Sequence, residues 1–348
     1  MRLVILGTGN MAAGHAAQFA AIDGVEIVAA IDVEVDRAAT FAASYDIPRT
    51  FGSLDEALDW GEFDAVTNVT PDRFHHPTSM QAIAAGKHVF CEKPLATHYD
   101  DAIEMAEAAE RAGVINMVNL TYRNVAELQK FRELVDAGTI GAIKHVEASY
   151  LQSWLVAKAW GDWRVEPTWL WRLSKGHGSN GTLGDIGIHI LDFAAYGINS
   201  PVENLFCRLK AFDKAPDGRV GDYVLDANDS FAMNIEFGCG ALGVMHATRW
   251  ASGYLNTLRL RAYGEKGGLE VQHGLDGSSL QICAGDDVEL AQWKPVQVEA
   301  VPTNYHRFAD AVRTGINGDP SFRYAADLQK VLDLGFVSDA ERREVAVI

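Results

Sequence analysis

Cysteine is scarce in this chain. Its 348 residues include four, which lie far apart and form no CxxC pair: Cys91, Cys207, Cys239 and Cys283. A chain of this length can bury a sufficient core without disulfide bonds, so reduced thiols and a cytoplasmic location are the simplest expectation. The 11 histidines are scattered, and no His/Cys/carboxylate cluster has a recognised metal-ligand spacing. We therefore expect no metal site.

Long apolar runs and positive charge are also lacking. The apolar start of the chain is interrupted at Gly7, which leaves no room for a signal peptide, and no later run is long enough to span a membrane. Lys and Arg number 30 against 47 Asp and Glu, a formal charge of −17. That charge repels phosphate backbones and anionic lipid surfaces. Neither nucleic acid nor a membrane is therefore expected as a partner.

What is present is the composition of a globular protein. Hydrophobic residues make up 48% of the chain and charged residues 22%, which excludes disorder, collagen and coiled coil, and the length predicts about two domains. Over the first ~120 residues, β-type runs alternate with helix-type runs, as in a parallel sheet with crossover helices. Strands are expected at 3–6, 25–32, 49–51, 64–69, 87–91 and 114–119. Helices are expected at 10–22, before 45, at 53–60 and at 100–112.

The pattern changes after Asn119. A helix is expected over 124–137, and residues 202–300 then hold strand-like segments with no helices between them. Strands joined directly by Gly, Asp and Asn turns indicate a largely antiparallel sheet. The tail from Tyr305 is helical again. We therefore predict an α/β fold with a parallel-sheet domain at 1–121 and a second α/β domain at 122–348, whose C-terminal helix can pack back on the first.

A glycine-rich turn directly follows the first predicted strand and opens the first predicted helix. Gly7 permits the tight turn, Gly9 lets the backbone approach a pyrophosphate, and the small Ala12 allows the helix to pack close to the sheet. The start of the helix, with Asn10 and Met11, presents free N–H groups and a positive dipole end to phosphates. Because strand, turn, helix and second strand occur in register, the pattern favours dinucleotide binding over a plain turn.

Asp32 ends the second predicted strand, 20 residues after Ala12. A carboxylate at that position accepts hydrogen bonds from the adenosine ribose hydroxyls and repels a 2′-phosphate, which favours NAD over NADP. Arg37, a few residues later, leaves NADP open. We therefore predict NAD as the cofactor, with NADP as the alternative.

Lys93 follows the fifth predicted strand, at the sheet edge where open α/β sheets bind ligands. Pro94 biases Lys93 to extended backbone. A lysine held there could hydrogen-bond a substrate oxygen and stabilise negative charge that develops on it. An ordinary surface lysine before a turn is an equal interpretation of this position taken alone.

The segment 184–196 carries polar residues at helical spacing. In an α-helix, Asp185, His189, Asp192 and Tyr196 fall on one stripe bracketed by apolar residues, like the wall of a cavity rather than a solvated face. His189 can exchange a proton near neutral pH, and Asp185 could orient its imidazole. A buried structural His–Asp pair is the alternative.

Together these features resemble the glucose–fructose oxidoreductase / inositol dehydrogenase / MocA-like family of NAD(P)-dependent oxidoreductases. The matching blocks are the turn at 7–12, TPDRFHHP at 70–77, AGKHVFCEKPLA at 85–96 and GDIGIHILD at 184–192. One departure is visible, since residues 179–181 are Ser-Asn-Gly instead of a run of glycines. The resemblance implies an N-terminal Rossmann domain and a C-terminal α/β domain. The open, mainly antiparallel mixed sheet of that second domain commonly builds the interface of a homodimer or homotetramer.

The resemblance also implies roles for particular residues. Lys93 would contact the substrate hydroxyl near the nicotinamide, His189 would be the general base, and Asp185 would position the substrate or that histidine. The other cofactor contacts would come from Thr70, Pro71, His75 and Glu92. Oxidising a secondary alcohol removes a hydride from carbon and a proton from oxygen, so a neutral base and a cation beside the forming alkoxide suit this reaction.

The substrate-binding segment is expected in a tryptophan-rich stretch. Residues 154–171 hold five of the eight tryptophans: Trp154, Trp160, Trp163, Trp169 and Trp171. Their indoles would suit the apolar faces of pyranose rings, or they fill the core of a long loop or an interface between subunits. Arg172 and His177 come next and are the preferred substrate contacts. A sugar, cyclitol or glycoside is the favoured class.

Three functions remain open from the sequence. The favoured one is an NAD-dependent dehydrogenase acting on a secondary alcohol of such a substrate. An NAD-dependent glycosidase that works by transient oxidation and elimination would use the same fold and base. A non-catalytic dinucleotide sensor is the third, and the presence of Lys93, Asp185 and His189 argues against it because a sensor needs no base.

Overall fold

The structure is a computed structural model that describes residues 1–347. The chain divides into two compact units. The first comprises Met1–Thr121 and Pro302–Lys330, and the second comprises Tyr122–Val301 and the chain from Val331 onward. Among the described residues, no helix has both the length and the apolar character needed to cross a membrane.

The first unit is built on a six-stranded parallel sheet in the order β3-β2-β1-β4-β5-β6. Its strands are β1 Arg2–Leu6, β2 Glu26–Ile31, β3 Thr50–Phe51, β4 Ala65–Asn68, β5 His88–Cys91 and β6 Asn116–Val118. All six predicted strands are therefore confirmed, and their observed bounds differ from the predicted ones by at most two residues at either end. The order places β1 and β4 at the centre, where a doubly wound sheet reverses its direction of winding.

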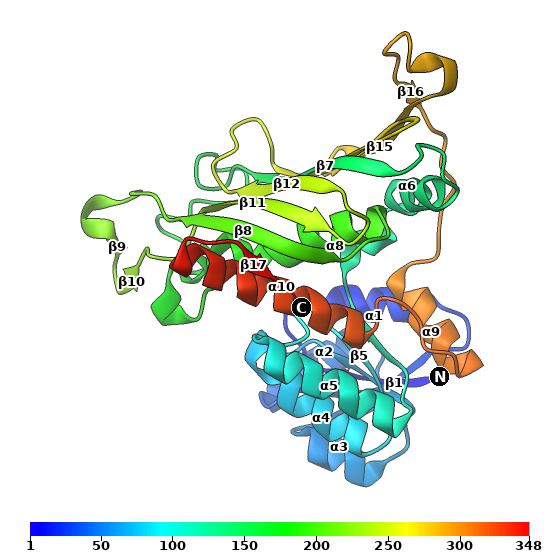
Figure 1. Ribbon diagram of the computed structural model, residues 1–348. Coiled ribbons are helices and arrows are strands. Elements are labelled where there is room, and N and C mark those ends of the chain that lie inside the picture. Colours follow the sequence, from blue (N-terminus) through cyan, green and yellow to red (C-terminus); the bar gives the residue numbers. More distant parts are fainter. Residues whose placement is uncertain (348) are drawn as a thin grey trace. The chain divides into compact units, whose positions relative to one another are not determined.

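Helices connect these strands, and Figure 1 shows α3, α4 and α5 in a row along one side of the sheet. Their bounds are α1 Ala12–Ala20, α2 Val35–Ser44, α3 Leu54–Trp60, α4 His75–Ala84 and α5 Tyr99–Ala112, with the short 3-10 turn η1 at Asp72–Phe74. Ser53 caps α3 by accepting a hydrogen bond from the Glu56 N–H at 3.3 Å, as the sequence predicts. Helix α4 was not predicted.

The segment 302–330 belongs to this unit because its aromatic rings pack into the unit's core. It contains α9 Asn304–Thr314 and the start of α10 Phe322–Glu341. Tyr305 and Phe308 of α9 lie 5.2 Å, between ring centroids, from Phe90 of β5, and Tyr305 lies 5.1 Å from Phe19 of α1. These buried rings join α9 to the core formed by α1 and β5.

The second unit contains a nine-stranded sheet in the order β16-β15-β14-β13-β7-β12-β11-β8-β17. Its strands are β7 Ile143–Gln152, β8 Val202–Lys210, β11 Ser230–Phe237, β12 Leu242–Thr248, β13 Asn256–Gly264, β14 Gly267–Gly274, β15 Gly277–Ala284, β16 Lys294–Pro295 and β17 Val345–Ala346. A separate hairpin joins β9 Arg219–Val220 to β10 Tyr223–Val224. Only the β7–β12 pair is parallel, so the predicted mainly antiparallel mixed sheet is confirmed.

This sheet has one packed face and one open face. Helices α6 Ala126–Asp136 and α8 Ile188–Gly197 pack against it on the same face (Figure 1). Along β11, Met233 and Ile235 are buried, whereas the alternating Asn234 and Glu236 are exposed. The alternation follows from the two-residue period of a strand and leaves the second face uncovered in the single chain.

The tryptophan-rich segment forms a small core of its own. Trp154 and Trp163 are almost fully buried, and Trp160 and Trp169 pack against the same apolar cluster, whereas Trp171 is 37% exposed. The only helices in this stretch are short: α7 Pro167–Leu170, η3 Trp171–Leu173 and η4 Lys175–His177. A loop this long buries large rings to become ordered, and Trp154 and Trp163 serve as the core of this one.

Candidate active site

The glycine turn between β1 and α1 has the geometry of a phosphate cradle. Gly7 has a φ of 91°, and a Cβ there would lie 2.8 Å from the Val69 carbonyl oxygen, so only glycine fits. Gly9 has no atom within 4 Å of the place where a Cβ would be. The turn is therefore closed toward the sheet at Gly7 and open at Gly9, beside the start of α1.

Asp32, just past β2, is buried beside this turn. Its Oδ2 accepts hydrogen bonds from the Thr8 backbone N–H and hydroxyl, both at 2.8 Å. Arg37 donates to both carboxylate oxygens, at 3.0 and 2.6 Å. Burial alone would raise the pKa of Asp32, but Arg37, the Glu34 N–H and Thr8 hold it well below its usual range. Asp32 is therefore ionised at neutral pH, with the half-exposed Arg37 guanidinium as its partner.

Glu92 and Lys93 follow β5. The Glu92 carboxylate is buried and accepts hydrogen bonds from His15 at 2.7 Å, from Asn119 at 2.6 Å and from the Lys93 backbone N–H at 3.2 Å. Burial alone would raise the pKa of Glu92, but the hydrogen bond and charge of His15 and the Asn119 bond lower it to about 2. The Glu92 carboxylate is thus used inside the protein, where it holds the backbone of Lys93.

His75 lies at the start of α4, after β4. It is buried, with Nδ1 2.6 Å from the Pro94 carbonyl oxygen and Nε2 2.8 Å from the Thr70 carbonyl oxygen. The Thr70 hydroxyl donates to Asn68 Oδ1 at 2.7 Å. The imidazole therefore contacts the backbone of two loops, those of Thr70 and Pro94, from inside the protein. Thr70 and Pro71 form the surface of the first of these loops.

These groups share one edge of the parallel sheet. The glycine turn, Asp32, the Thr70 loop and Lys93 each follow the carboxyl end of a strand, β1, β2, β4 and β5 in turn. In open α/β sheets this is the ligand-binding edge. The structure thus brings together all the predicted cofactor residues of the first unit at that edge.

The second unit carries Asp185 and His189 on a helix that differs from the expected one. Residues Leu183–Gly187 form a π-helical turn, η5, which runs directly into α8. Asp192 forms a buried ion pair with Arg123 at 2.7 Å, and the Arg123 guanidinium lies 3.8 Å from the centre of the Tyr196 ring. The expectation of one cavity-lining stripe is therefore wrong for its second half, because Arg123 of η2 Thr121–Asn124 binds Asp192 and Tyr196 inside the unit.

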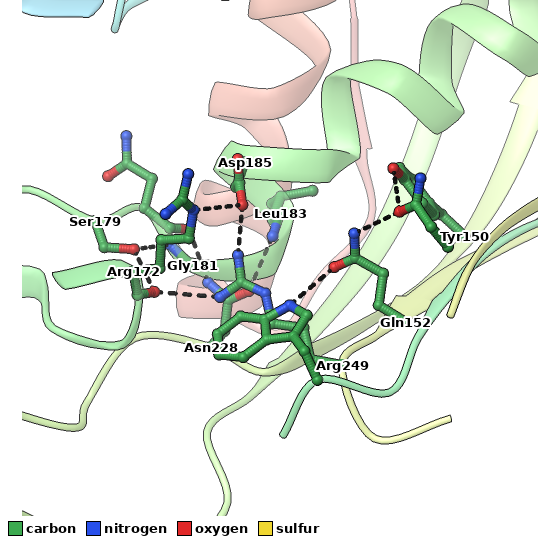
Figure 2. A network of polar contacts seen from close by, with 12 residues as sticks. Tyr150, Gln152, Arg172, Ser179, Gly181, Leu183, Asp185, Asn228 and Arg249 are labelled. Atoms are coloured by element: carbon green, nitrogen blue, oxygen red, sulfur yellow. Dashed lines mark hydrogen bonds and ion pairs between the residues drawn. The ribbon is translucent and has the colours of Figure 1, made fainter. Parts of the chain in front are cut away.

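Asp185, in the π-helical turn, is held by two arginines (Figure 2). Its Oδ2 accepts from Arg249 Nη2 at 2.8 Å and lies 3.7 Å from Arg172 Nε. Arg249 is fully buried, and its Nη1 donates to the Arg172 carbonyl oxygen at 3.2 Å. Asp185 and Arg172 are both partly exposed. The sequence gives no local signal for Arg249, which follows β12.

His189, one turn further along, lies among tyrosines. Its ring centroid is 5.0 Å from Tyr122 and 6.4 Å from Tyr150. The two hydroxyls are 2.5 Å apart, and the Tyr150 hydroxyl donates to Asn256 Oδ1, which also accepts from Gln152. Figure 2 shows Tyr150 and Gln152 close together at the end of β7. Sequence reasoning missed this polar chain because its members lie on η2, β7 and β13.

His177 and the loop after it are also defined. The His177 ring stacks on Tyr223 with 4.1 Å between centroids, and Nδ1 lies 3.0 Å from the Ser174 hydroxyl. Gly181 has a φ of 68°, and a Cβ there would lie 2.4 Å from Asn228 Nδ2. Only Gly181 of the Ser-Asn-Gly segment thus needs to be glycine, which explains why a run of glycines is unnecessary.

One cluster within ligand reach of a metal ion occurs among residues 1–347. His76, Asp101 and Glu104 lie at the surface, and His76 Nε2 is 2.8 Å from a Glu104 oxygen. It is a surface hydrogen bond with a second carboxylate nearby, an arrangement that is common without a metal ion. It adds no chemistry to the candidate site.

Comparison with known proteins agrees with this geometry. Residues 1–120 match the model of the oxidoreductase family with an NAD-binding Rossmann fold, and residues 128–270 match the C-terminal domain of the same GFO/IDH/MocA family. Levoglucosan dehydrogenase of Pseudarthrobacter phenanthrenivorans is 28% identical over 244 residues, which are 64% of this chain and 60% of that protein. D-glucoside 3-dehydrogenase of Escherichia coli is 29% identical over 249 residues, 70% of this chain and 68% of that protein.

A solved structure of levoglucosan dehydrogenase in complex with NADH and levoglucosan shares the fold. Its TM-score is 0.85 at 23% identity, with 100% of this chain and 99% of that chain covered. The chain spans only between half and two thirds of the length of the first curated relatives it matches. The two family models nevertheless cover both units, and the chain belongs to the GFO/IDH/MocA family of oxidoreductases with an NAD-binding Rossmann domain.

Proposed function

We propose that the protein is an NAD-dependent oxidoreductase that moves a hydride between nicotinamide and a secondary alcohol of a sugar, cyclitol or glycoside. The observation that supports this most strongly is the position of Lys93. It lies at the ligand edge of the sheet, after β5, while the glycine cradle follows β1 at the same edge. A cation placed there can stabilise negative charge on a substrate oxygen close to a bound dinucleotide.

The residues of the cradle fit the cofactor. The pyrophosphate would bind at the open side of Gly9 and the start of α1, and the adenosine ribose would meet Asp32. Asn10, Met11, Thr70 and Pro71 would line the rest. When bound, nicotinamide supplies the hydride acceptor or donor.

The protein's own residues would manage the proton and the charge on oxygen. In the oxidation direction, the substrate hydroxyl gives its proton to the His189 imidazole while the carbon loses its hydride. Lys93 stabilises the alkoxide that forms. Asp185, which accepts a hydrogen bond from Arg249, would position the substrate through hydrogen bonds from its hydroxyls. Each transfer leaves the atoms and charges balanced.

The names of the relatives support a sugar-like substrate. Levoglucosan and D-glucosides, named for the two relatives, are neutral sugars with secondary hydroxyls. Arg172, stacked on Trp171 and next to Asp185, would donate to such hydroxyls. His177 would contact a more distant part of the substrate, because its ring is already stacked on Tyr223.

A homo-oligomer is also proposed, with the open face of the nine-stranded sheet as its interface. Leu242 and Val244 of β12 are 58% and 40% exposed on that face. Apolar side chains at alternate positions of a central strand are unusual on a surface that stays in water. A second copy, as dimer or tetramer, would bury them.

Stoichiometry of the cofactor tests the activity. A panel of polyols, aldoses, glycosides and disaccharides is incubated with NAD or NADP while absorbance of the reduced cofactor and sugar products are measured. A dehydrogenase forms one NADH per oxidised product. Release of free sugar without net NADH would instead show an NAD-dependent glycosidase, and binding of NAD with no turnover of any compound would indicate a sensor.

A further inference from the structure

The His75 ring makes two contacts that a neutral histidine cannot make together. Nδ1 lies 2.6 Å from the Pro94 carbonyl oxygen and Nε2 lies 2.8 Å from the Thr70 carbonyl oxygen. A carbonyl oxygen only accepts, and a neutral imidazole has one N–H. In either neutral tautomer, one nitrogen lone pair would face a carbonyl lone pair at hydrogen-bond distance, inside the protein.

We propose that His75 is a buried imidazolium that donates to both carbonyl oxygens and thereby acts as a positioning residue for Lys93. The positioning part of the inference rests on the proposed function, in which Lys93 acts on the substrate oxygen. The protonation state does not rest on it.

The surroundings of the ring support a charged form. Burial alone would lower the pKa of His75, but the Cys91 side chain of β5, Asp72 of η1 and the Pro94 carbonyl raise it to about 10. Because the pKa is raised above the ordinary value, the charged form and its two bonds are present at neutral pH and are lost only as the pH rises through that range. Asp72 and Cys91 are the titratable groups that face the ring from the neighbouring elements.

The two carbonyls belong to the loops that carry the proposed site. Thr70 lies in the loop after β4, which would line the cofactor site, and Pro94 directly follows Lys93. The Lys93 N–H is held from the other side by Glu92 Oε2 at 3.2 Å. The backbone of Lys93 is thus fixed between a buried carboxylate and a buried imidazolium, and deprotonation of His75 would release one of the two loops.

The protonation state is tested on the unmodified enzyme. Protein labelled with nitrogen-15 histidine is studied by NMR between about pH 7 and pH 8.5, where an ordinary histidine is neutral. We expect both His75 ring nitrogens to show the imidazolium shift throughout, with the signal assigned from its loss in His75→Asn. A neutral tautomer pattern for His75 in this range would overturn the proposal whether or not the enzyme is a dehydrogenase.

The positioning role is tested by a double-mutant cycle. Gln carries both of its N–H donors on one nitrogen, whereas the imidazolium donates from two separate ring nitrogens. His75→Gln should therefore not hold both carbonyls in place, and kcat should fall at least about tenfold, since a displaced catalytic group loses rate steeply. His76→Gln, at the partly exposed next residue, is the matched control and should keep wild-type kcat. In a Lys93→Ala background, His75→Gln should have little further effect.

The outcomes separate the two ideas. A full, multiplicative loss in the Lys93→Ala background would show that His75 does not act through Lys93, and would overturn the positioning role. If Lys93→Ala alone keeps wild-type activity, the proposed function of Lys93 fails, and the NMR result still decides whether His75 is an imidazolium.

Discussion

At Asp32, one carboxylate both interacts with a charged neighbour and is the proposed contact for the cofactor. Its two oxygens accept five hydrogen bonds, from Thr8, Glu34 and Arg37. Among these three partners, Arg37 is the one that bonds through a half-exposed side chain. A ribose hydroxyl that binds Asp32 would therefore share or replace the Arg37 contact, and we propose that the pair determines cofactor choice.

Asp32→Ala should shift the cofactor preference from NAD toward NADP. The variant loses the ribose acceptor, so NAD should bind about tenfold more weakly, and the released Arg37 can pair with a 2′-phosphate. Dissociation constants measured by calorimetry check this. Asp36→Ala, on the exposed side of α2, is the matched control, and an unchanged preference in Asp32→Ala would refute the role of Asp32.

Glu92 should make the free energy of unfolding depend on pH in the acidic range. Its folded pKa of about 2 lies below the ordinary 4.5, so its contribution is complete above about pH 5 and is lost as the pH falls toward 2. Glu92→Gln should lower the free energy of unfolding by about 1–3 kcal/mol at pH 7, with a smaller difference near pH 4. Urea unfolding at both pH values measures this; Glu62→Gln, exposed, is the control. A difference that grows in acid would contradict the assignment.

At the scale of elements, strands were easier to predict than helices. The strands of the first unit are buried on both faces, so they form continuous apolar runs, and those of the second unit alternate. Helix α4 was not predicted, because Met80 and Ile83 are its only large apolar side chains and give no clear apolar stripe. The π-helical turn could not be predicted, because it adds one residue to a helical turn without any change in the types of residue.

The partners that hold the site residues could not be predicted, because they come from distant parts of the chain. Asn119 donates hydrogen bonds to Glu92 and to Tyr305, and Tyr305 lies 186 residues further along the chain. Arg249 donates a hydrogen bond to Asp185, from which it is 64 residues away in sequence. Sequence spacing identifies which side chains carry reactive groups. Packing decides which of them lie together, as with Arg123 and Asp192.

Arg249 at the end of β12 should support the π-helical turn. Arg249→Ala removes the hydrogen bond to Asp185 and opens a cavity against Trp154, so the protein should lose about 3–5 kcal/mol of stability and most of its turnover. Arg249→Lys should recover part of both. Thermal unfolding and kcat are the measurements, with Arg259→Ala of β13 as control. Wild-type kcat in Arg249→Ala would show that Asp185 needs no such partner.

At the scale of the whole molecule, the features relevant to partners are the surface charge and the open sheet face. A formal charge of −17 disfavours polyanions, while the open face carries Leu242 and Val244 in its centre. The sequence predicted the two-sheet α/β architecture and its family, and the sheet order of both units agrees with it. The number of subunits depends on shape and area, which no residue pattern encodes.

Val244→Lys should weaken self-association if the open face is the interface. A charge at the centre of a buried apolar contact costs several kcal/mol, enough to change the mass at micromolar concentration. Light scattering coupled to size-exclusion chromatography measures it. Ile316→Lys, exposed in the other unit, is the control. An unchanged mass in Val244→Lys would place the interface elsewhere or exclude one.

The most direct measurement is the single-turnover rate of nicotinamide reduction in wild type, Lys93→Ala and His189→Ala, with the NAD dissociation constant determined on the same samples. We predict that both substitutions lower the rate by at least about 100-fold, as loss of a general base or of charge stabilisation does, while NAD affinity stays within about twofold. Either variant reducing nicotinamide at close to the wild-type rate would contradict the assignment of that group to the chemistry.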